Sequence, residues 1–264
     1  MKRAKQIVRM LAQMPSVVAA RALRKTGRSP RFSGAYASRA LALAALPAAK
    51  QAGYDDHEIA DVSFALMCQR VAWDYPVVFW LDRLLPQLTA VTDAGGHLGT
   101  KYIAFSDVLD LSRVNWVVYD LPGIIDVARK KQQGSILPSA ITFESALENL
   151  PTGDLVLASG LLQYLDAPFP EFVRSLPQRP KYIMLNKVAL WDGPNTFAIE
   201  RIGPGRVPYQ MRNRAGFEAE IAAMGYVIED QWDIDGLGHV IATHPWLGRS
   251  QSAGYVLKCG SQAG

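Results

Sequence analysis

The sequence has few cysteines and no long uncharged stretch. Its 264 residues include only two cysteines, Cys68 and Cys259, which lie far apart and make no metal-ligand spacing. A disulfide framework is therefore not expected, and a reducing compartment is the default. The best apolar run, 40–49, has ten residues and is interrupted by a proline, whereas a membrane span needs about 20. The sequence thus predicts a globular protein of the cytoplasm.

Acidic residues are absent from the first part of the chain. Residues 1–54 contain eleven Lys or Arg and no Asp or Glu, whereas residues 55–264 contain 17 Lys or Arg against 24 Asp or Glu. The net charge of +4 therefore combines a basic arm with an acidic body. This difference in charge sets the first boundary, and we expect a basic N-terminal arm over 1–54.

The arm has the pattern of an amphipathic helix. Ile7, Leu11, Met14 and Val18 recur at helical spacing among the basic residues of 1–31. Such a segment can lie on an anionic membrane, which would place the protein at the inner face of the membrane. A solvated terminus and an Arg-rich targeting segment are the alternatives. No aromatic residues interleave the charges, so we expect no nucleic-acid binding.

The body alternates helices with short apolar strands. A helix beginning near Asp74 and Pro76 is expected within a helical lead-in over 55–88. Residues 89–264 follow as an α/β domain, because continuous apolar strands that alternate with helices indicate a parallel sheet covered on both faces. The expected strands are 89–93, 116–120, 140–143, 154–159, 181–185, 226–233 and 254–259.

Two strand ends carry residues that point to a ligand, because ligands of open α/β sheets bind beyond the carboxyl ends of the strands. The first strand leads into DAGGHLG (93–99), whose glycines allow close backbone approach and whose Asp93 can accept from a ligand ammonium. Asp120, 21 residues beyond Gly99, can accept both ribose hydroxyls of a nucleoside. Together they favour a cofactor that contains adenosine. The other candidate cofactor contacts are Gly95, Gly96, Leu121, Ser159 and Gly160, with Phe143 and Glu144 on either side of an adenine ring.

The spacing of the glycines distinguishes between two candidate cofactors, a dinucleotide and S-adenosylmethionine. A dinucleotide fingerprint would read G-x-G-x-x-G, with the pyrophosphate at a helix N-terminus. Here the order is G-G-x-x-G, and Asp93 stands two residues before the first glycine. An acid is unfavourable beside a pyrophosphate but favourable beside the sulfonium and ammonium of S-adenosylmethionine. We therefore expect S-adenosylmethionine, and an NAD-type oxidoreductase is the alternative.

The same residues carry a family resemblance. Class I S-adenosylmethionine-dependent methyltransferases use an acid-x-Gly-x-Gly-x-Gly loop, an acid that ends the second strand, and an Asp followed by two hydrophobic residues in the fourth. Asp93, Asp120 and Asp154 resemble that pattern. The resemblance implies a Rossmann-like, mostly parallel sheet of seven strands, with the last strand antiparallel. The helical lead-in would be an N-terminal extension.

A narrower resemblance covers about residues 32–260. DAGGHLG, WVVYDLPG, DLVLASGLLQYLDAP and GYVIEDQW are similar to a family of methyltransferases, assigned mostly by similarity, that bacteria often encode among surface-polysaccharide biosynthesis genes. It implies a glycan or other small-molecule acceptor. The chain departs from the pattern at two places. His97 stands near the place of the middle glycine, and Asn186 and Lys187 stand where an arginine is expected.

Methyl transfer to a hydroxyl needs a proton acceptor. His97 is the first candidate, ahead of Tyr164, Tyr209 and His239, although a loop histidine can also be only a hydrogen-bonding residue. No metal is expected. Residues 192–214 are polar and rich in Gly and Pro, which predicts either a lid over the acceptor or a solvated connection. The candidate acceptor contacts are Gln163, Asn186, Lys187, Arg201 and Arg212. A non-catalytic scaffold protein is a further alternative.

Overall fold

The computed structural model describes residues 13–23, 30–46, 64–151, 153–203 and 205–260. The chain divides into two units, each described by itself. The first unit comprises Met1–Gly53, Ala189–Phe217 and Asp235–Ser252, and the second comprises Tyr54–Val188, Glu218–Ile234 and Ala253–Gly264. The units interleave along the chain, a division that the sequence analysis did not predict.

Most basic residues of the predicted arm lie outside the described residues. Residues 13–23 form a helix, in which Met14 and Val18 of the predicted apolar face are exposed. Within the described part of the chain, no helix is long and apolar enough to cross a membrane.

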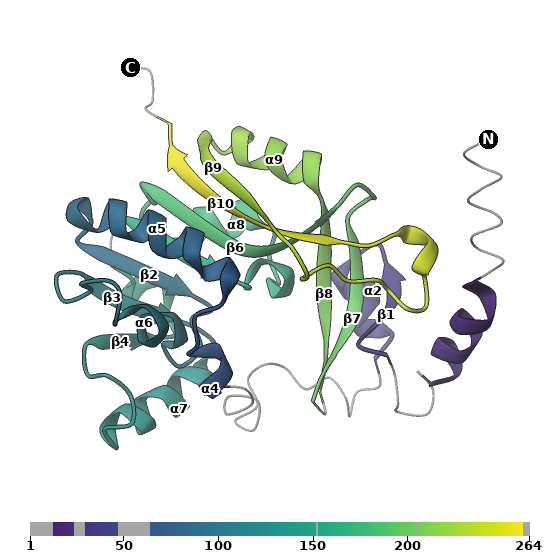
Figure 1. The fold of residues 1–264 in the computed structure, drawn as a ribbon, viewed down its shortest axis with the longest axis horizontal. Coiled ribbons are helices and arrows are strands. Elements are labelled where there is room, and N and C mark those ends of the chain that lie inside the picture. Colours follow the sequence, from purple (N-terminus) through teal and green to yellow (C-terminus); the bar gives the residue numbers. More distant parts are fainter. Residues whose placement is uncertain (1–12, 24–29, 47–63, 152, 204, 261–264) are drawn as a thin grey trace. The chain divides into compact units, whose positions relative to one another are not determined.

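The second unit contains the predicted sheet, in the strand order β4-β3-β2-β5-β6-β10-β9 (Figure 1). The first five strands in this order pair in parallel. Cys259 at the end of β10 donates its N–H to the carbonyl of Lys181, which precedes β6, so β10 runs antiparallel to β6. The strands are β2 (Ala90–Ala94), β3 (Asn115–Tyr119), β4 (Ile141–Glu144), β5 (Leu155–Ser159), β6 (Tyr182–Trp191), β9 (Tyr226–Ile234) and β10 (Gln251–Cys259). The predicted, mostly parallel order of these seven strands is thereby confirmed, although the sheet has ten strands among the described residues.

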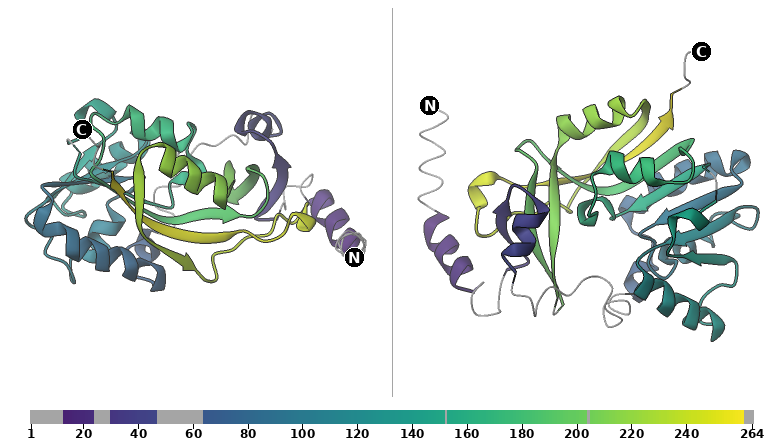
Figure 2. Two further views of the ribbon diagram at one scale, coloured as in Figure 1. Left: turned by 90° about the horizontal axis from the view of Figure 1, so that it is seen from above. Right: turned by 180° about the vertical axis from the view of Figure 1, so that it is seen from behind.

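Helices cover both faces of this sheet. The helix α5 lies on one face and α8 on the other (Figures 1 and 2). Pro76 is in the first turn of α5, as predicted, and the buried stripe of α5 packs in one apolar core with the strand residues Trp116 and Leu157. The helices are α4 (Phe64–Met67), α5 (Tyr75–Leu84), α6 (Thr100–Phe105), α7 (Pro122–Gln133), α8 (Phe169–Ser175) and α9 (Arg214–Ala223), with the 3-10 turns η2 (Ala72–Asp74), η3 (Leu85–Gln87), η4 (Leu147–Asn149) and η5 (Leu162–Tyr164).

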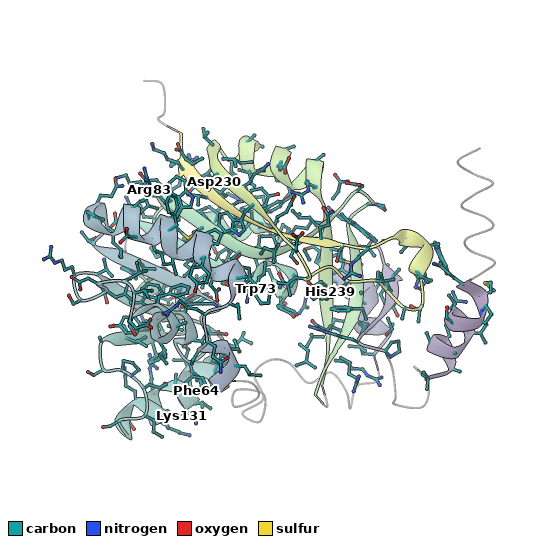
Figure 3. The ribbon with its side chains drawn as sticks, in the orientation of Figure 1. Phe64, Trp73, Arg83, Lys131, Asp230 and His239 are labelled. Atoms are coloured by element: carbon teal, nitrogen blue, oxygen red, sulfur yellow. The ribbon has the colours of Figure 1, made fainter. Side chains whose placement is uncertain are left out.

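A hydrogen bond joins α5 to β9. The indole N–H of Trp80 donates to Asp230 Oδ2 on β9 at 2.6 Å. Figure 3 labels Asp230 beside Arg83, whose guanidinium lies 5.8 Å from the Trp80 ring. The described part of the helical lead-in therefore packs against the sheet of the second unit.

The first unit contains strands that the sequence analysis missed. It consists of β1 (Phe32–Tyr36), α2 (Arg39–Ala44), β7 (Thr196–Ile202), β8 (Gly205–Asn213), the end of β6 and the turn η6 (Pro245–Leu247). The strand β7 pairs antiparallel with both β1 and β8, and the ends of β8 and β6 pair in parallel.

The predicted lid over 192–214 is wrong, because most of this segment is a β-hairpin. Ala198, Val207, Tyr209 and Met211 are buried, and so are most of the residues between them, so both faces of the two strands are largely covered. Buried arginines on β8 lie among these apolar residues, which made the segment resemble a solvated loop. Residues 32–36, assigned to the basic arm, are likewise a strand.

Candidate functional site

The loop 93–99 follows β2 and adopts an alternating backbone conformation. Gly95, His97 and Gly99 have φ angles of 69°, 57° and 78°. These left-handed positions have the spacing of the three glycines in acid-x-Gly-x-Gly-x-Gly, so His97 occupies the place of the middle glycine. A side chain in this conformation costs about 1–3 kcal/mol. The departure noted in the sequence is thus a substitution within a turn of the same length rather than a shifted loop.

Close packing also requires the loop glycines. A methyl group added at Gly96 would lie 2.5 Å from Asp93 Cγ, and one added at Gly99 would lie 2.5 Å from Ile141 Cδ1. Real Cβ contacts are not that short. The loop therefore folds tightly over the end of β2, and its backbone can approach a ligand closely.

Asp93 lies beneath the loop. Its residue is 1% exposed, and its Oδ2 accepts from the indole N–H of Trp116 at 3.4 Å. Burial raises the pKa of Asp93 to about 7, against the Trp116 hydrogen bond and the charges of Lys101 and Lys187, which lower it. The Asp120 charge raises the pKa further, which also places the two acids near each other.

Asp120 follows β3 and orders the loop. Ala94 pairs with Tyr119, so the acid and the loop emerge at the same sheet edge. Asp120 Oδ2 accepts the His97 N–H at 2.9 Å, and Oδ1 accepts the Leu121 N–H at 2.8 Å. Asp120 therefore holds the loop 93–99 at the end of β3.

The end of β5 and the middle of β6 bring three polar side chains together. Ser159 pairs with Asn186, whose carbonyl accepts the Gly160 N–H at 2.9 Å. Gln163 is 7% exposed and Asn186 is 1% exposed. Asn186 Nδ2 donates to the carbonyl of Trp73 at 3.1 Å, and Trp73 is labelled in Figure 3. Among the described residues, Ser159 Oγ, Gln163 Oε1 and Asn186 Oδ1 are buried without a hydrogen-bond partner.

Lys187 extends this polar group. Its φ is 60°, a conformation uncommon outside glycine. Its Nζ lies 3.3 Å from the position that a Cβ would take at Gly160, whose own φ is 88°. Burial lowers the pKa of Lys187 to about 8, and the Lys101 charge acts in the same direction, whereas Asp74 and Asp93 oppose it.

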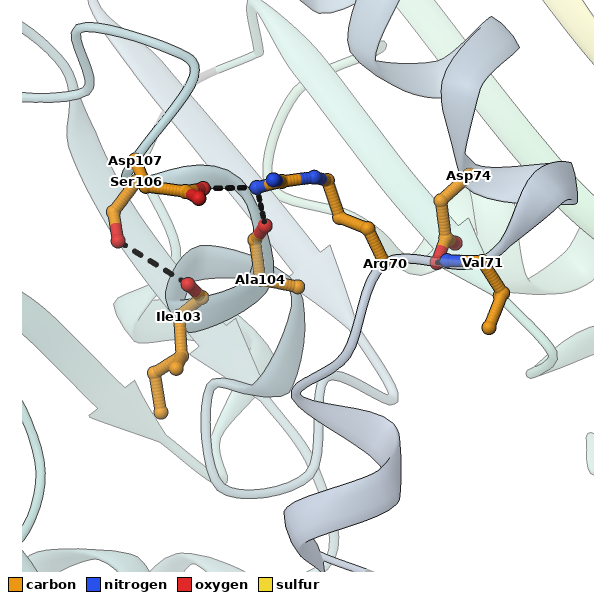
Figure 4. Close-up of polar contacts among 7 residues, drawn as sticks. All are labelled: Arg70, Val71, Asp74, Ile103, Ala104, Ser106 and Asp107. Atoms are coloured by element: carbon orange, nitrogen blue, oxygen red, sulfur yellow. Dashed lines mark hydrogen bonds and ion pairs between the residues drawn. The ribbon is translucent and has the colours of Figure 1, made fainter.

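A buried ion pair beside these groups was not predicted. Lys101 Nζ lies 2.6 Å from Asp74 Oδ1. Asp74 Oδ2 accepts the Val71 N–H at 3.2 Å, and both residues are drawn in Figure 4. From the sequence, Asp74 was predicted only as the start of a helix. One signal could have found the pair: Lys101 is in the first turn of α6, where the helix dipole disfavours a cation.

The segment before Asp74 is anchored to α6. Arg70 Nη1 donates to the carbonyl of Ala104 at 2.8 Å and pairs with the carboxylate of Asp107 (Figure 4). In the same turn Ser106 Oγ donates to the carbonyl of Ile103 at 3.2 Å. These contacts fix the chain that carries Asp74 toward Lys101.

Phe143 and Glu144, which were predicted to lie on either side of an adenine ring, make other contacts. Phe143 is 3% exposed and packs in the apolar core. Glu144 Oε1 lies 3.5 Å from Arg129 Nη2, and its Oε2 accepts from Asn149 Nδ2 at 3.2 Å. Because Phe143 packs in the core and Glu144 pairs with Arg129, the structure does not support their predicted contact with an adenine ring. Tyr164 is half-buried on η5 and Leu121 is exposed, and their roles stay predictions.

Three predicted acceptor or catalytic residues belong to the first unit, whereas the loop belongs to the second. Tyr209 on β8 is buried edge-on against Phe32, with ring centroids 4.9 Å apart. Arg212 on β8 is also buried, and its guanidinium lies 5.9 Å from the Phe217 ring. Arg201 is exposed on β7. Arg201 and Arg212 were predicted to contact the acceptor because they would lie in a lid. They lie instead in a β-hairpin, so this reason no longer applies.

His239, a candidate proton acceptor, packs in the first unit. Its ring stacks on Phe32 with centroids 4.4 Å apart. Burial lowers the pKa of His239 to about 4, and the charges of Arg31 and Arg249 act in the same direction. This histidine is neutral at physiological pH. No group of His, Cys, Asp and Glu that could hold a metal ion occurs within the described ranges.

No family model and no curated protein matches the chain. Solved structures are similar to it. Human N-acetylserotonin methyltransferase, crystallised with S-adenosylmethionine, is 13% identical over 82% of this chain, with a TM-score of 0.51. The match covers 61% of the human chain. A Listeria monocytogenes protein described as an S-adenosylmethionine-dependent methyltransferase is 10% identical over 73% of this chain and 100% of its own, with a TM-score of 0.50. The fold is therefore the Rossmann-like fold of the class I methyltransferases.

Proposed function

We propose that the chain binds S-adenosylmethionine at the carboxyl ends of β2 and β3 and transfers its methyl group to a small acceptor. The observation that carries the proposal is the bond from the His97 N–H to Asp120 Oδ2. It joins a loop with left-handed positions at 95, 97 and 99 to the acid that ends the next strand. In the class I fold, the two elements are placed to hold a nucleoside.

The residues present fit a cationic nucleoside. Asp93 and Asp120 supply negative charge on either side of the loop, which complements a sulfonium and an ammonium. The same acids would repel the pyrophosphate of NAD. Asp120 would accept from the ribose hydroxyls, and the backbone at Gly95 and Gly96 would contact the cofactor closely. When bound, S-adenosylmethionine supplies an electrophilic methyl group. The chain's task is then to hold the acceptor in line and to exclude water.

The acceptor that we propose is a hydroxyl group of a sugar or other small molecule. Its support is the sequence resemblance to methyltransferases of surface-polysaccharide gene clusters. The matching test is radiolabelled methyl transfer to soluble and lipid-linked glycan extracts. Label in either extract supports a glycan acceptor, and label only in non-glycan small molecules contradicts it.

Calorimetry tests the cofactor directly. The wild-type protein should bind S-adenosylmethionine and S-adenosylhomocysteine and give no heat with NAD. Asp120→Ala should weaken binding about tenfold or more, because a hydrogen bond to a charged group is worth about 1.5–3 kcal/mol. Asp110→Ala is the matched control, since Asp110 is exposed and its carboxylate pairs with its chain neighbours, Ser112 Oγ at 2.5 Å and Arg113 Nε at 3.8 Å. It should bind as the wild type does.

Two results would contradict the proposal. One is the absence of heat with both sulfur nucleosides. The other is binding of NAD with equal loss in Asp120→Ala, which would identify a dinucleotide site. Cofactor binding without transfer to any extract would instead favour a scaffold protein.

A further inference from the structure

The amine of Lys187 has a position that its backbone conformation imposes. Non-glycine residues at positive φ cost about 1–3 kcal/mol and gather at functional sites. Here the strained residue directly follows Asn186, within β6. The conformation places Nζ over Gly160, which has no side chain to displace it. The backbone of two strands is thus arranged around one amine.

Two buried acceptor oxygens at the same sheet edge have no donors in the described part of the chain. Gln163 Oε1 and Asn186 Oδ1 are buried, and neither has a hydrogen-bond partner among the described residues. Both residues are more than nine-tenths buried. Leaving such groups unsatisfied costs free energy, and native structures rarely do so without a ligand or ordered water. A ligand with several hydroxyl or amino donors would satisfy them.

Charges from three other elements face Lys187. Lys101 on α6 lowers its pKa, while Asp74 on η2 and Asp93 on β2 raise it. The first two largely cancel, because they form the 2.6 Å ion pair. Burial is the main influence and lowers the Lys187 pKa to about 8. A substantial fraction of the amine is therefore neutral near physiological pH, as a general base requires.

The backbone of His97 forms part of the loop 93–99. Its backbone takes the place of the middle loop glycine, and its N–H is bound by Asp120. Both observations concern the backbone of His97, so its ring stays one candidate for the proton acceptor. A second candidate lies at the same sheet edge.

We propose that Lys187 is the proton acceptor of the transfer reaction and that Gln163 and Asn186 bind neighbouring hydroxyl or amino groups of a polyhydroxylated acceptor. The inference rests on the proposed function. As the acceptor oxygen bonds to the methyl carbon, the carbon–sulfur bond breaks and its electron pair stays on sulfur. The hydroxyl proton passes to the lone pair of Lys187 Nζ, and the resulting ammonium later releases it to water.

The test uses Lys187→Met and Lys187→Arg, because arginine keeps the positive charge but cannot act as a base near neutral pH. Lys258→Met is the control, since Lys258 is partly exposed on β10 and pairs with Glu229 at 3.6 Å. All three variants should bind S-adenosylhomocysteine within about threefold of the wild type in calorimetry. With a panel of free and nucleotide-linked sugars, both Lys187 variants should lose turnover about 100-fold or more. Lys258→Met should turn over as the wild type does.

A second readout does not depend on turnover. In protein labelled with ¹⁵N-lysine, the Lys187 amine is assigned by its absence in Lys187→Met. It should titrate well below the ordinary lysine value of about 10.4. The wild-type rate should rise with pH through the same titration. Gln163→Leu should raise the acceptor KM about tenfold and leave kcat within about threefold, since it removes one hydrogen bond.

The outcomes separate the two proposals. Failure of the wild type to bind S-adenosylhomocysteine would overturn the proposed function, and this inference with it. Normal binding together with an ordinary Lys187 titration would overturn only the inference, even where no sugar is turned over. Turnover retained in Lys187→Arg would do the same.

Discussion

The buried carboxyl group of Asp93 should make the second unit less stable at high pH. The pKa is about 7 in the folded protein against an ordinary value of 3.8, because burial disfavours the charged form. Between these values the folded state binds more protons than the unfolded state. The free energy of unfolding therefore falls as pH rises from about 4 to about 7. Asp93→Asn should remove this loss, because asparagine stays neutral.

The magnitude follows from the shift. About three pKa units at about 1.36 kcal/mol each give an upper limit of about 4 kcal/mol for the charged form. The asparagine side chain in Asp93→Asn would keep an oxygen to accept the Trp116 indole N–H and would fit the same volume. Relative to the wild type, the variant should gain up to about 4 kcal/mol near pH 8 but only about 1 kcal/mol near pH 4.5, where the unfolded carboxyl group is already mostly charged.

Urea denaturation of both proteins at these two pH values measures the effect. The comparison must be the difference between variant and wild type, because other groups titrate as well. The lowered pKa of His239 makes stability rise with pH between about 4 and 6.5, the opposite sign. The lowered pKa of Lys187 makes stability rise only between about 8 and 10.5. The His239 contribution cancels in the difference, whereas the Lys187 contribution cancels only in part, because Asp93 itself raises the Lys187 pKa.

Asp154→Asn is a control in which the free energy of unfolding should change in the opposite direction. Burial acts to raise the pKa of Asp154, but hydrogen bonds from Thr89 and Ala90 together lower it below its ordinary value. Its charged form stabilises the fold, so this variant should lose stability near pH 8. The reasoning about Asp93 would be refuted by a variant no more stable than the wild type near pH 8, or by an equal gain at both pH values. Asp93→Asn should also weaken S-adenosylhomocysteine binding, because it removes charge beside the cofactor.

Three further predictions concern single contacts. Lys101→Met leaves the Asp74 carboxylate buried and unpaired, and should cost about 3–5 kcal/mol in urea denaturation; a loss below about 1 kcal/mol would contradict the ion pair. Gly99→Ala places a Cβ 2.5 Å from Ile141 Cδ1 at a φ of 78°, and should lower stability by about 1–3 kcal/mol and weaken S-adenosylhomocysteine binding in calorimetry. His239→Phe should remove the stability lost below about pH 6.5, and an unchanged pH dependence of thermal unfolding would argue against its burial as a neutral ring.

The sequence predicted the sheet unit well, because its signals are local. Apolar runs alternating with helical periodicity located all seven strands, and Pro76 located the start of α5. The loop 93–99 and Asp120 follow adjacent strands. Parallel strands end at one sheet edge, so the topology alone put these residues together.

Other features of the site depend on residues far apart in the chain. The Lys101–Asp74 pair joins positions 27 residues apart, and nothing local to either residue names its partner. The core position of Phe143 depends on how α7 covers β4. The positive φ of Lys187 occurs inside a strand that reads as continuous, so no turn residue announced it.

The amino-acid sequence by itself determined the order of elements, the cofactor-type loop and its acidic partner, because spacing and hydrophobic periodicity record them directly. Only the tertiary structure decided that 192–214 is a hairpin, that His97 has a glycine conformation, and which buried polar atoms lack donors. The physical reason is that burial and pairing arise from contacts across the chain. A charged residue therefore looks the same in sequence whether it lies in water or in the core.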